Sequence, residues 1–551
     1  MNTTIPAFVV GGKVVEDIIV NDRVTTTALV GGGYEGASRF ERETSNWSPT
    51  MRSPDQVINS VKPLADARTR DMVQNDGYAS GASTLHKDNI VGSLFRLNAK
   101  PDWKLLGVSQ EWAEEFQQIV ESRFTTIGES DNCYFDASGR NTFTGLIRLA
   151  VGGFVLTGEV LATAEWLRDT IRPIKTAIQL VSPDRLSNPM GASDTRTLRR
   201  GINLDSRGKP ISYWFRGGHP SETYDLNSYQ WKEVMAEKPW GRKQVIHIIE
   251  QLLPDQSRGI ADMVSALKNM KMTKKFQDIT LQNAVINASF AAAIESELPS
   301  GEVFATLGAN NTNGAIGGMN DYLQFYLSSL GTYLDSSKNI QVDGAKIPHL
   351  FPGTKLNMQP VGTPGGVGSE FEQSLLRNTA ACLGLSYEQF SRDYTNTNYS
   401  SARASMNETY KFMQARKTSV ADRFASSIYR LYLEEDIANG NLPLPPGKDR
   451  NWFYEPLVKD AISRASWIGA SRGQIDEMKE TQAAIMRILG GLSTYEIECS
   501  KLGYDFRDLF EQRARENKIM DNLGLEFSTE TKKTNEQNHD TVGKKDNGGQ
   551  Q

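Results

Sequence analysis

The feature that most constrains the fold of this chain is a long helical pattern in its C-terminal third. Seven apolar residues recur at spacings of four, three, seven, four, four and three, and they are Met406, Tyr410, Met413, Val420, Phe424, Ile428 and Leu431. This periodicity places the side chains in one stripe along an α-helix. A helix over residues 402–437 would be about 54 Å long at 1.5 Å per residue. Such a length is more than a single small globule needs.

A polar loop precedes this helix. Residues 392–401 read RDYTNTNYSS, and a second helical pattern lies before them from residue 369. Because the loop is rich in hydrogen-bonding groups and poor in aliphatic side chains, it has to face water or a polar ligand. Tyr394 and Tyr399 could rest against sugar or base faces of a nucleic acid, or fold back onto the neighbouring helices.

A second long helix is predicted over residues 258–298, between Pro254 and Pro299. Its basic residues form a compact patch, in which Lys268, Lys271 and Lys275 share one face and Lys274 lies beside them. The patch could be a solvated helix face, or it could contact DNA or an acidic subunit. The helix then turns to small residues (NASFAAAIESEL), which permit close approach between helices.

Composition narrows the class of protein. The net charge of the 551 residues is -5, from 61 basic and 66 acidic residues, whereas a protein that grips DNA tightly is usually basic. Three widely spaced cysteines exclude a disulfide framework and a four-thiolate zinc site. The N-terminus lacks the pattern of a secretory signal. The most hydrophobic window, residues 146–167, contains Arg148, Glu159 and Glu165, so we expect no membrane span.

The motifs of catalysis are mostly missing from the sequence. It holds no G-x-x-x-x-G-K-[ST] loop, which argues against an ATPase. One G-x-S-x-G pattern occurs around Ser471, but the preceding residues look helical rather than extended, and none of the five histidines lies in a partner motif. The histidines also lack metal-ligand spacing. We therefore predict no catalytic residue, no metal and no cofactor, and keep a serine hydrolase using Ser471 as a remote alternative.

The rest of the chain divides by composition. A stretch rich in Gly, Ser and Thr up to about residue 65 predicts a flexible arm. Residues 75–255 mix the two periodicities of an α+β domain, with helices at 77–90 and 110–123 and strands at 211–215 and 244–249. A glycine-rich region with a tyrosine-rich helix (321–334) and short strands (340–350 and 355–359) comes next. Helices at 473–489 and 494–517 precede a polar tail, which predicts disorder.

Several of these segments together resemble a known family. The stretch GLSYEQFSRDYTNTNYSSARAS from Gly384 is similar to the core of the lambda-like branch of the tailed-phage portal proteins. Further stretches agree in the same order: NDGYASGASTLHKDNIVGSLFRL, LVSPDRLSNP, PWGRKQVIHI, the KMTKK helix to AAAIESEL, WIGASRGQIDEMKE and GLSTYEIECSKLGYD. The resemblance covers roughly residues 75–516.

The resemblance implies a mainly α, α+β fold: an elongated portal subunit with wing, stem, clip and crown, which forms a ring around a central channel. Its parts would be an N-terminal arm (1–65), the wing (66–257), a stem helix (258–298), the clip (299–368), a second stem helix (369–387), a tunnel loop (388–401), a long helix joining stem to wing (402–440), a helical wing or crown region (441–520) and a disordered tail (521–551).

The resemblance also implies function and partners. The chain would form a ring, usually of twelve subunits, at one vertex of a capsid, and double-stranded DNA would pass through it without sequence specificity. Partners would be the terminase large subunit, the major capsid and scaffolding proteins and the head-completion protein, in the host cytoplasm during assembly and then in the virion. The DNA-facing residues would be Arg392, Asp393, Tyr394, Thr395, Asn396, Asn398, Tyr399 and Ser400 in the loop, with Lys268, Lys271, Lys274, Lys275 and Arg403 in the stem. A DNA-binding adaptor that never closes a ring is the alternative.

Overall fold

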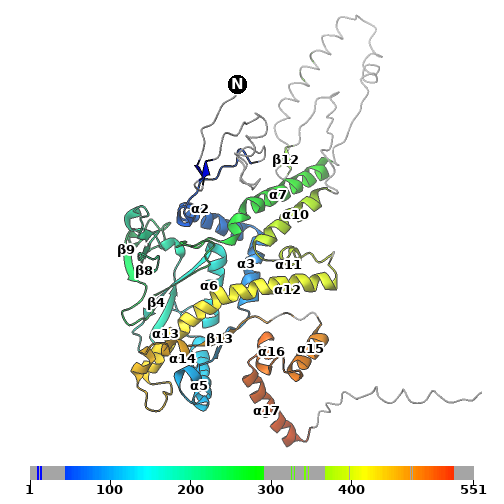
Figure 1. The fold of residues 1–551 in the computed structure, drawn as a ribbon. Coiled ribbons are helices and arrows are strands. Elements are labelled where there is room, and N and C mark those ends of the chain that lie inside the picture. The colour runs from blue at the N-terminus through cyan, green and yellow to red at the C-terminus, as the bar shows by residue number, and fades with distance from the viewer. Residues whose placement is uncertain are drawn as a thin grey trace, which may run out of the picture.

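The architecture is mainly helical with small sheets, which confirms the predicted fold class (Figure 1). The computed structural model describes residues 44–290, 367–395, 397–471, 473 and 476–525, with residues 324 and 328 and four short strands. These strands are β1 (Val9–Val10), β2 (Lys13–Val14), β11 (Gln341–Val342) and β12 (Ala345–Lys346), and they pair as β1–β2 and β11–β12. Within the described ranges, no helix is both long and apolar enough to cross a membrane.

Two helices open the body of the molecule. Helix α2 (Pro54–Asn75) begins at a capping box, in which Ser53 and Gln56 satisfy each other's backbone N–H groups. Helix α3 (Gly77–Ile90) has the predicted bounds. Because α2 starts at Pro54 and buries Asn59 and Lys62, the prediction of a flexible arm up to residue 65 is wrong for its last part. The prediction rested on the Gly, Ser and Thr content of residues 25–65, which includes the run GGGYEG but also the first half of α2.

The predicted α+β domain, residues 75–255, contains both helices and strands. Helix α5 (Gln110–Gly128) confirms the helix predicted from Gln110 and continues five residues further, and α4 (Trp103–Leu106) and α6 (Phe143–Thr157) flank it. One sheet has the order β10 (Val245–Ile249), β4 (Glu159–Trp166), β5 (Thr176–Leu180). A second has the order β6 (Leu198–Arg199), β7 (Ile202–Leu204), β8 (Pro210–Arg216), β9 (Trp231–Met235). Strands β8 and β10 confirm the two predicted strands.

Two helices project from the body on one side (Figure 1). They are α7 (Leu267–Phe290) and α10 (Val367–Cys382), and they lie side by side. The helix predicted from residue 258 begins later, because residues 256–259 are buried in the body and a 3-10 turn (Asp262–Ser265) comes before α7. Helix α10 ends at Cys382, not at 387. The predictions for residues 291–340 and 347–366 lie outside the described residues, apart from Gln324 and Ser328, which are helical.

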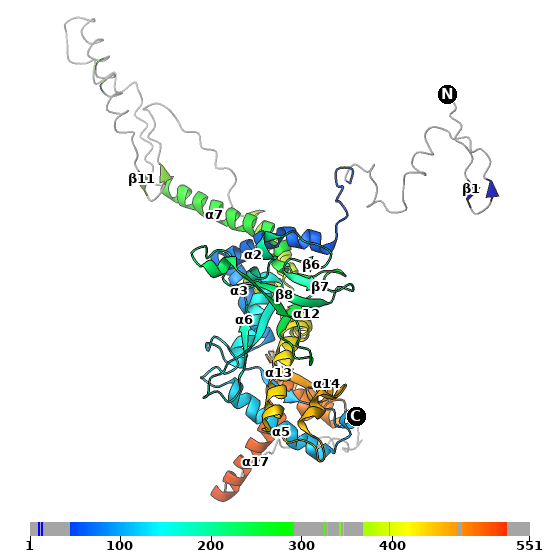
Figure 2. The same ribbon diagram turned by 90° about the vertical axis from the view of Figure 1, so that its left-hand side faces the viewer.

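The long helical pattern forms one continuous helical run with a change of winding in its middle. It consists of α12 (Tyr399–Arg416), a π-helical turn (Lys417–Asp422) and α13 (Arg423–Asn439). The turn begins four residues after Met413 and contains Val420, so it covers the end of the stripe's spacing of seven. The stripe is buried from Met413 to Leu431, whereas Met406 and Tyr410 are half-buried. Figure 2 shows the run descending through the body in the second view.

The core joins this run to the rest of the body. The ring of Phe124 on α5 contacts Phe143 on α6 and Tyr432 on α13, with centroids 4.9 and 5.2 Å apart. Trp467 on strand β13 (Ala465–Ile468), which pairs with β3 (Arg96–Ala99), stacks on Phe95 at 5.7 Å. Aromatic rings from elements far apart in sequence thus fix the long helix against the body.

The C-terminal helices are shorter than predicted. After α14 (Val458–Ile462) come α15 (Glu477–Leu489), α16 (Tyr495–Lys501) and α17 (Phe506–Leu523). The helix predicted over 494–517 is broken at Gly503, whose φ of 83° is left-handed, and the helix resumes to Leu523, inside the predicted tail. The remaining short elements are α11 (Tyr387–Ser391) and 3-10 turns at Pro183–Arg185, Pro189–Gly191, Leu226–Tyr229 and Arg450–Tyr454.

Candidate nucleic-acid interface

The predicted tunnel loop lies at the free end of α12, on the side from which α7 and α10 project (Figure 1). It is shorter than predicted. Helix α11 occupies residues 387–391 and α12 starts at Tyr399, so the loop proper runs over residues 392–398. Ser400 and Tyr399 therefore belong to the first turn of α12, and Asn396 lies outside the described residues.

Local hydrogen bonds give the loop a defined shape. Arg392 adopts a left-handed backbone conformation (φ 59°) that ends α11. The Asp393 carboxylate accepts hydrogen bonds from the backbone N–H of Thr395 (3.0 Å) and from its hydroxyl (2.6 Å). These bonds, with the Thr395 hydroxyl contributing most, lower the pKa of Asp393 below its ordinary value. The loop thus carries a fixed negative charge beside the exposed side chain of Arg392.

The base of the loop is anchored on both sides. Phe390 on α11 is buried and stacks on Tyr78 of α3, with ring centroids 5.6 Å apart. On the other side, Asn398 caps α12 by accepting a hydrogen bond from the backbone N–H of Ser401 at 2.9 Å. Between these anchors Tyr394 is 55% exposed. The side chains of Tyr394 and Arg392 are therefore exposed to a ligand, on a loop whose two ends are anchored by α11 and α12.

The predicted basic patch divides into two environments on α7. Lys268, Lys271 and Lys275 are exposed, and no described carboxylate lies within ion-pair distance of them. Lys274 is different, because its ammonium donates a hydrogen bond to the Asn75 carbonyl at the end of α2, at 2.5 Å. It thus ties α7 to the body and offers less charge to a ligand than its three neighbours do.

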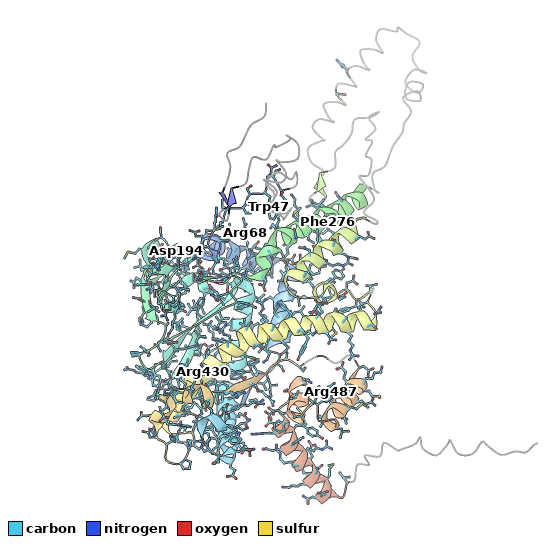
Figure 3. The ribbon with its side chains drawn as sticks, viewed as in Figure 1. Trp47, Arg68, Asp194, Phe276, Arg430 and Arg487 are labelled. Carbon is cyan, nitrogen blue, oxygen red and sulfur yellow. The ribbon has the colours of Figure 1, made fainter. Side chains whose placement is uncertain are left out.

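The opposite side of α7 packs on α10. The rings of Phe276 and Phe371 meet edge to face at 6.1 Å, and Phe276 is labelled on α7 in Figure 3. Asn269 donates to Asn378 at 2.8 Å, and Gln277 donates to Glu372 at 2.6 Å. Helix packing therefore leaves the three exposed lysines on the surface. In Figure 1, α10 and α11 lie between α7 and α12, so the helix that carries the lysines and the loop before α12 are separate parts of the molecule.

Arg403 is placed away from the lysines. It lies on α12 and lines a cavity of about 60 Å³ with Met406 and with Glu480 of α15. The cavity also borders Gln389 of α11, whose side-chain oxygen has no hydrogen-bond partner among the described residues. The resemblance grouped Arg403 with the stem lysines. In the structure Arg403 lies on α12, and its cavity is shared with Gln389 of α11 and with Glu480 of the C-terminal helices.

Sequence reasoning missed a buried ion cluster where the body leads into α7. The Glu159 carboxylate accepts from Arg258 at 2.5 Å and lies 3.3 Å from the Lys62 ammonium and 3.2 Å from His247. Burial raises the pKa of Glu159, but Arg258 and Lys62 outweigh burial and hold it well below the ordinary range. Burial also raises the pKa of Asp66, which pairs with Lys62, to about 6. A glutamate within the apolar run of β4 was the available signal.

The structure shows the surroundings of Ser471 and the hydrogen-bond partners of the described histidines. Strand β13, not a helix, precedes Ser471, so that part of the argument was wrong. The described histidines bond elsewhere: His86 to the Ala82 carbonyl, His247 to Glu159, and His219 to Ser221 and Asp184. In the last group Asp184 comes from the 3-10 turn Pro183–Arg185, and Arg70 also pairs with it at 2.6 Å. Among the described residues no cluster of His, Cys, Asp and Glu could hold a metal ion.

Comparison with known proteins identifies the class. Residues 40–417 match the family described as phage portal protein, lambda family. The portal protein of Escherichia phage N15 is 36% identical over 536 residues, which cover 96% of this chain and 99% of that one. Portal protein B of Escherichia phage lambda is 37% identical over 497 residues, covering 90% and 91% of the two chains. The chain belongs to the lambda family of phage portal proteins.

One further relative and one solved structure are also similar to this chain. A probable portal protein of Halomonas phage phiHAP-1 is 20% identical over 500 residues, with 89% and 87% of the chains covered. Among solved structures, the neck of a native gene transfer agent particle, computed with C12 symmetry, covers 82% of this chain and 93% of that one at 10% identity and a TM-score of 0.37. The family assignment rests on the sequence matches alone.

Proposed function

We propose that this chain assembles into a ring of twelve at one vertex of a phage capsid and conducts double-stranded DNA through its centre during packaging and ejection. The observation that carries the proposal is membership of the portal family over most of the chain. The body up to β10 would serve as the wing, α7 and α10 as the stem, and residues 299–368 as the clip. Residues 441–520 would form the helical wing or crown region.

The geometry of the loop supports a steric role in the channel. A helical run from Tyr399 to Asn439 is buried in the core at one end and holds an exposed polar loop at the other. Because the helix is anchored in the core, it would hold Arg392 and Tyr394 at the same position in every subunit of a ring. Tyrosine can contact any nucleotide through its ring face, and a single arginine offers a weak phosphate contact. Contacts of this kind are suited to DNA that has to slide.

The partners would be those of a capsid vertex. We propose contacts with the terminase large subunit, the major capsid and scaffolding proteins and the head-completion protein, during assembly in the host cytoplasm and then in the virion. We propose no covalent step for this chain. In support, Ser471 is bordered by Met406, Glu480 and other residues of a small cavity, and the three described histidines hydrogen-bond elsewhere.

Substitution in the loop tests the proposed function. Arg392→Ala with Tyr394→Ala should leave the mass of the ring unchanged in light scattering and lower the amount of DNA packaged in a complementation assay several-fold. Substitution is preferable to deleting residues 395–398, because Asn398 caps α12. Lys411→Ala, an exposed change on α12 away from the loop, is the matched control. Normal packaging by the loop variant would remove the loop from the mechanism, and a monomeric wild-type protein would contradict the ring.

A further inference from the structure

A second surface lies on the body, remote in sequence from the loop and the lysines of α7. A cavity of about 530 Å³ is bounded by strand β10, the start of β8, and the π-helical turn with the start of α13. Arg430, labelled on the left side of the molecule in Figure 3, belongs to its wall. The proposed DNA path makes no use of this cavity, so a ligand bound in it would be independent of DNA conduction.

One wall of the cavity is formed by the edge of the three-stranded sheet that contains β10. Four consecutive residues of β10, Val245 to Ile248, line it. Side chains of a strand alternate between its two faces, so four consecutive lining residues indicate that the strand presents its edge. The sheet order β10-β4-β5 agrees, because β10 has a neighbouring strand on one side only. At the start of β10 the N–H groups of Gln244 and Val245 already donate to the Ala236 carbonyl, so the open part of the edge begins at His247. An open edge is a template for a further strand.

The hydrogen-bond register shows which backbone groups face the cavity. The N–H of Ala164 donates to the carbonyl of Gln244 at 2.9 Å, and β10 pairs with β4 in the register Val245 to Thr163. In an antiparallel pair, alternate residues exchange both bonds with their partner. Ile246 and Ile248 therefore point their backbone groups at β4, whereas Val245, His247 and Ile249 point theirs outward. The outward N–H of Val245 already donates to the Ala236 carbonyl at 3.2 Å. No described residue accepts from the N–H of His247 or Ile249.

The charged residues that line the cavity are four cations, Lys209, Lys243, Arg423 and Arg430, and two carboxylates, Glu237 and Asp422, so the lining is positive on balance. Among the described residues, none of Lys209, Lys243 and Arg423 has a carboxylate within ion-pair distance. By contrast, Arg430 pairs with Asp460 at 2.8 Å, and Asp422 pairs with Lys417 at 2.7 Å. Loss of hydration lowers the pKa of Lys243, and the charges of Arg430 and Arg423 lower it further against the opposing effect of Glu237. The like charges thus repel one another, which an anionic ligand would relieve.

We propose that this cavity binds an extended peptide segment of a partner protein, which adds as a strand to the edge of β10 and carries carboxylates between apolar side chains. The outward backbone groups supply main-chain hydrogen bonds, as in other cases of strand addition. The three unpaired cations select carboxylates, and Pro210, Val245 and Trp467 offer an apolar wall. A nucleic acid would match the cations but neither the strand edge nor the apolar wall.

The test uses the full chain and a labelled probe peptide, acetyl-Val-Glu-Val-Asp-Val-Thr amide. Fluorescence anisotropy should show saturable binding, with at least tenfold weaker binding of the matched peptide in which lysine replaces both acidic residues. Hydrogen exchange of the His247 and Ile249 amides should slow when the acidic peptide is bound. A probe that is N-methylated at alternate residues should not bind, because it cannot form the ladder.

Three variants separate a loss of charge from a loss of folding. Lys243→Glu with Arg423→Glu should weaken binding of the acidic peptide at least tenfold, whereas Lys518→Glu on the exposed face of α17 should not change it. Arg423→Gln alone, a milder change, should give an intermediate loss. Equal binding of the lysine peptide, unchanged exchange at β10, or complete displacement of the peptide by a short DNA duplex would each overturn the proposal.

Discussion

Glu159 is the residue on which the junction between the body and α7 depends most. It is fully buried, and its carboxylate is the common partner of Arg258, Lys62 and His247. Arg258 also donates to the carbonyls of Pro183, Leu186 and Arg200, each at 3.0 Å. One carboxylate therefore fixes the loops beside the sheet and the segment that leads into α7.

Replacing Glu159 with Gln should destabilise the protein strongly. The substitution leaves the buried charges of Arg258 and Lys62 without full compensation, and breaking one partner of a buried pair costs about 3–5 kcal/mol. Thermal unfolding monitored by circular dichroism is the measurement. Glu165→Gln on the same strand is the control, because Glu165 is half-buried and bonds only to Thr163. A similar loss in both variants would show that the buried cluster has no special role.

The raised pKa of Glu121 should make the stability of the protein depend on pH. Burial raises the pKa of its carboxyl to about 7, against the lowering effect of Gln117 and the Ala99 N–H. A raised folded pKa means that the folded state holds the proton more tightly, so this contribution to stability is complete below about pH 4.5 and is lost as the pH rises to 7.

Glu121→Gln should flatten this dependence. The amide oxygen can still accept from Ala99 and Gln117, while the loss on ionisation disappears, so the variant should gain on the order of 2 kcal/mol relative to the wild type at pH 8 compared with pH 5. The midpoint of thermal unfolding at the two pH values is the readout. Parallel pH curves for the two proteins would contradict the assignment.

At the scale of elements, α7 combines two functions on its two sides. One side packs on α10 through Phe276 and Gln277, and the other exposes three lysines. In the proposed function, the side that packs on α10 would support the stem and the exposed lysines would contact phosphates weakly. Lys274, next to the patch, is already engaged by the Asn75 carbonyl and serves as an internal control.

Removing the charges of Lys268, Lys271 and Lys275 by alanine substitution should weaken binding of the assembled protein to duplex DNA. Each lost phosphate contact reduces the slope of log K against log salt by about 0.9. DNA affinity measured between about 50 and 200 mM salt gives this slope. Lys274→Ala should leave the slope unchanged and lower thermal stability instead. If all four substitutions change the slope alike, the distinction between the lysines is wrong.

The π-helical turn explains how the long helix keeps its apolar stripe. Lys417 is buried in this turn, where its ammonium bonds to Asp422 at 2.7 Å and to the Trp467 carbonyl at 2.8 Å. A uniform α-helix would carry the stripe through Lys417 itself, at a spacing of four from Met413. The wider turn lets a buried charge find partners, and α12 and α13 continue on either side of it.

At the scale of the whole molecule, the C-terminal helices are attached to the body chiefly by polar contacts. Arg96 pairs with Asp508 at 3.0 Å, and Lys100 pairs with Glu496 at 2.6 Å. The side chains in these pairs are 34–74% exposed, and such ion pairs contribute about 0–1 kcal/mol each. Helices α15 and α17 have no buried residue, while Met486, Leu489 and Leu523 are largely exposed.

Arg96→Ala with Lys100→Ala should therefore release α15–α17 without unfolding the body. Limited proteolysis should cut the connection between β13 and α15 faster, at least about threefold, while the thermal midpoint of the body stays within about 2 °C of the wild type. Lys104→Ala, an exposed change on α4, is the control. An unchanged cleavage rate would mean that apolar contacts, not these ion pairs, hold the helices.

The sequence by itself determined the features that repeat locally. The bounds of α3, the strands β8 and β10, the long apolar stripe and the polar loop were all predictable, because periodicity and capping residues act over a few neighbours. The family motifs around Gly384 identified the class of protein. Tertiary structure decided the rest. Arg258, Lys62 and Glu159 are buried together only because α2, β4 and the segment before α7 meet in space, and the partner of each charge is set by contacts that sequence spacing does not encode.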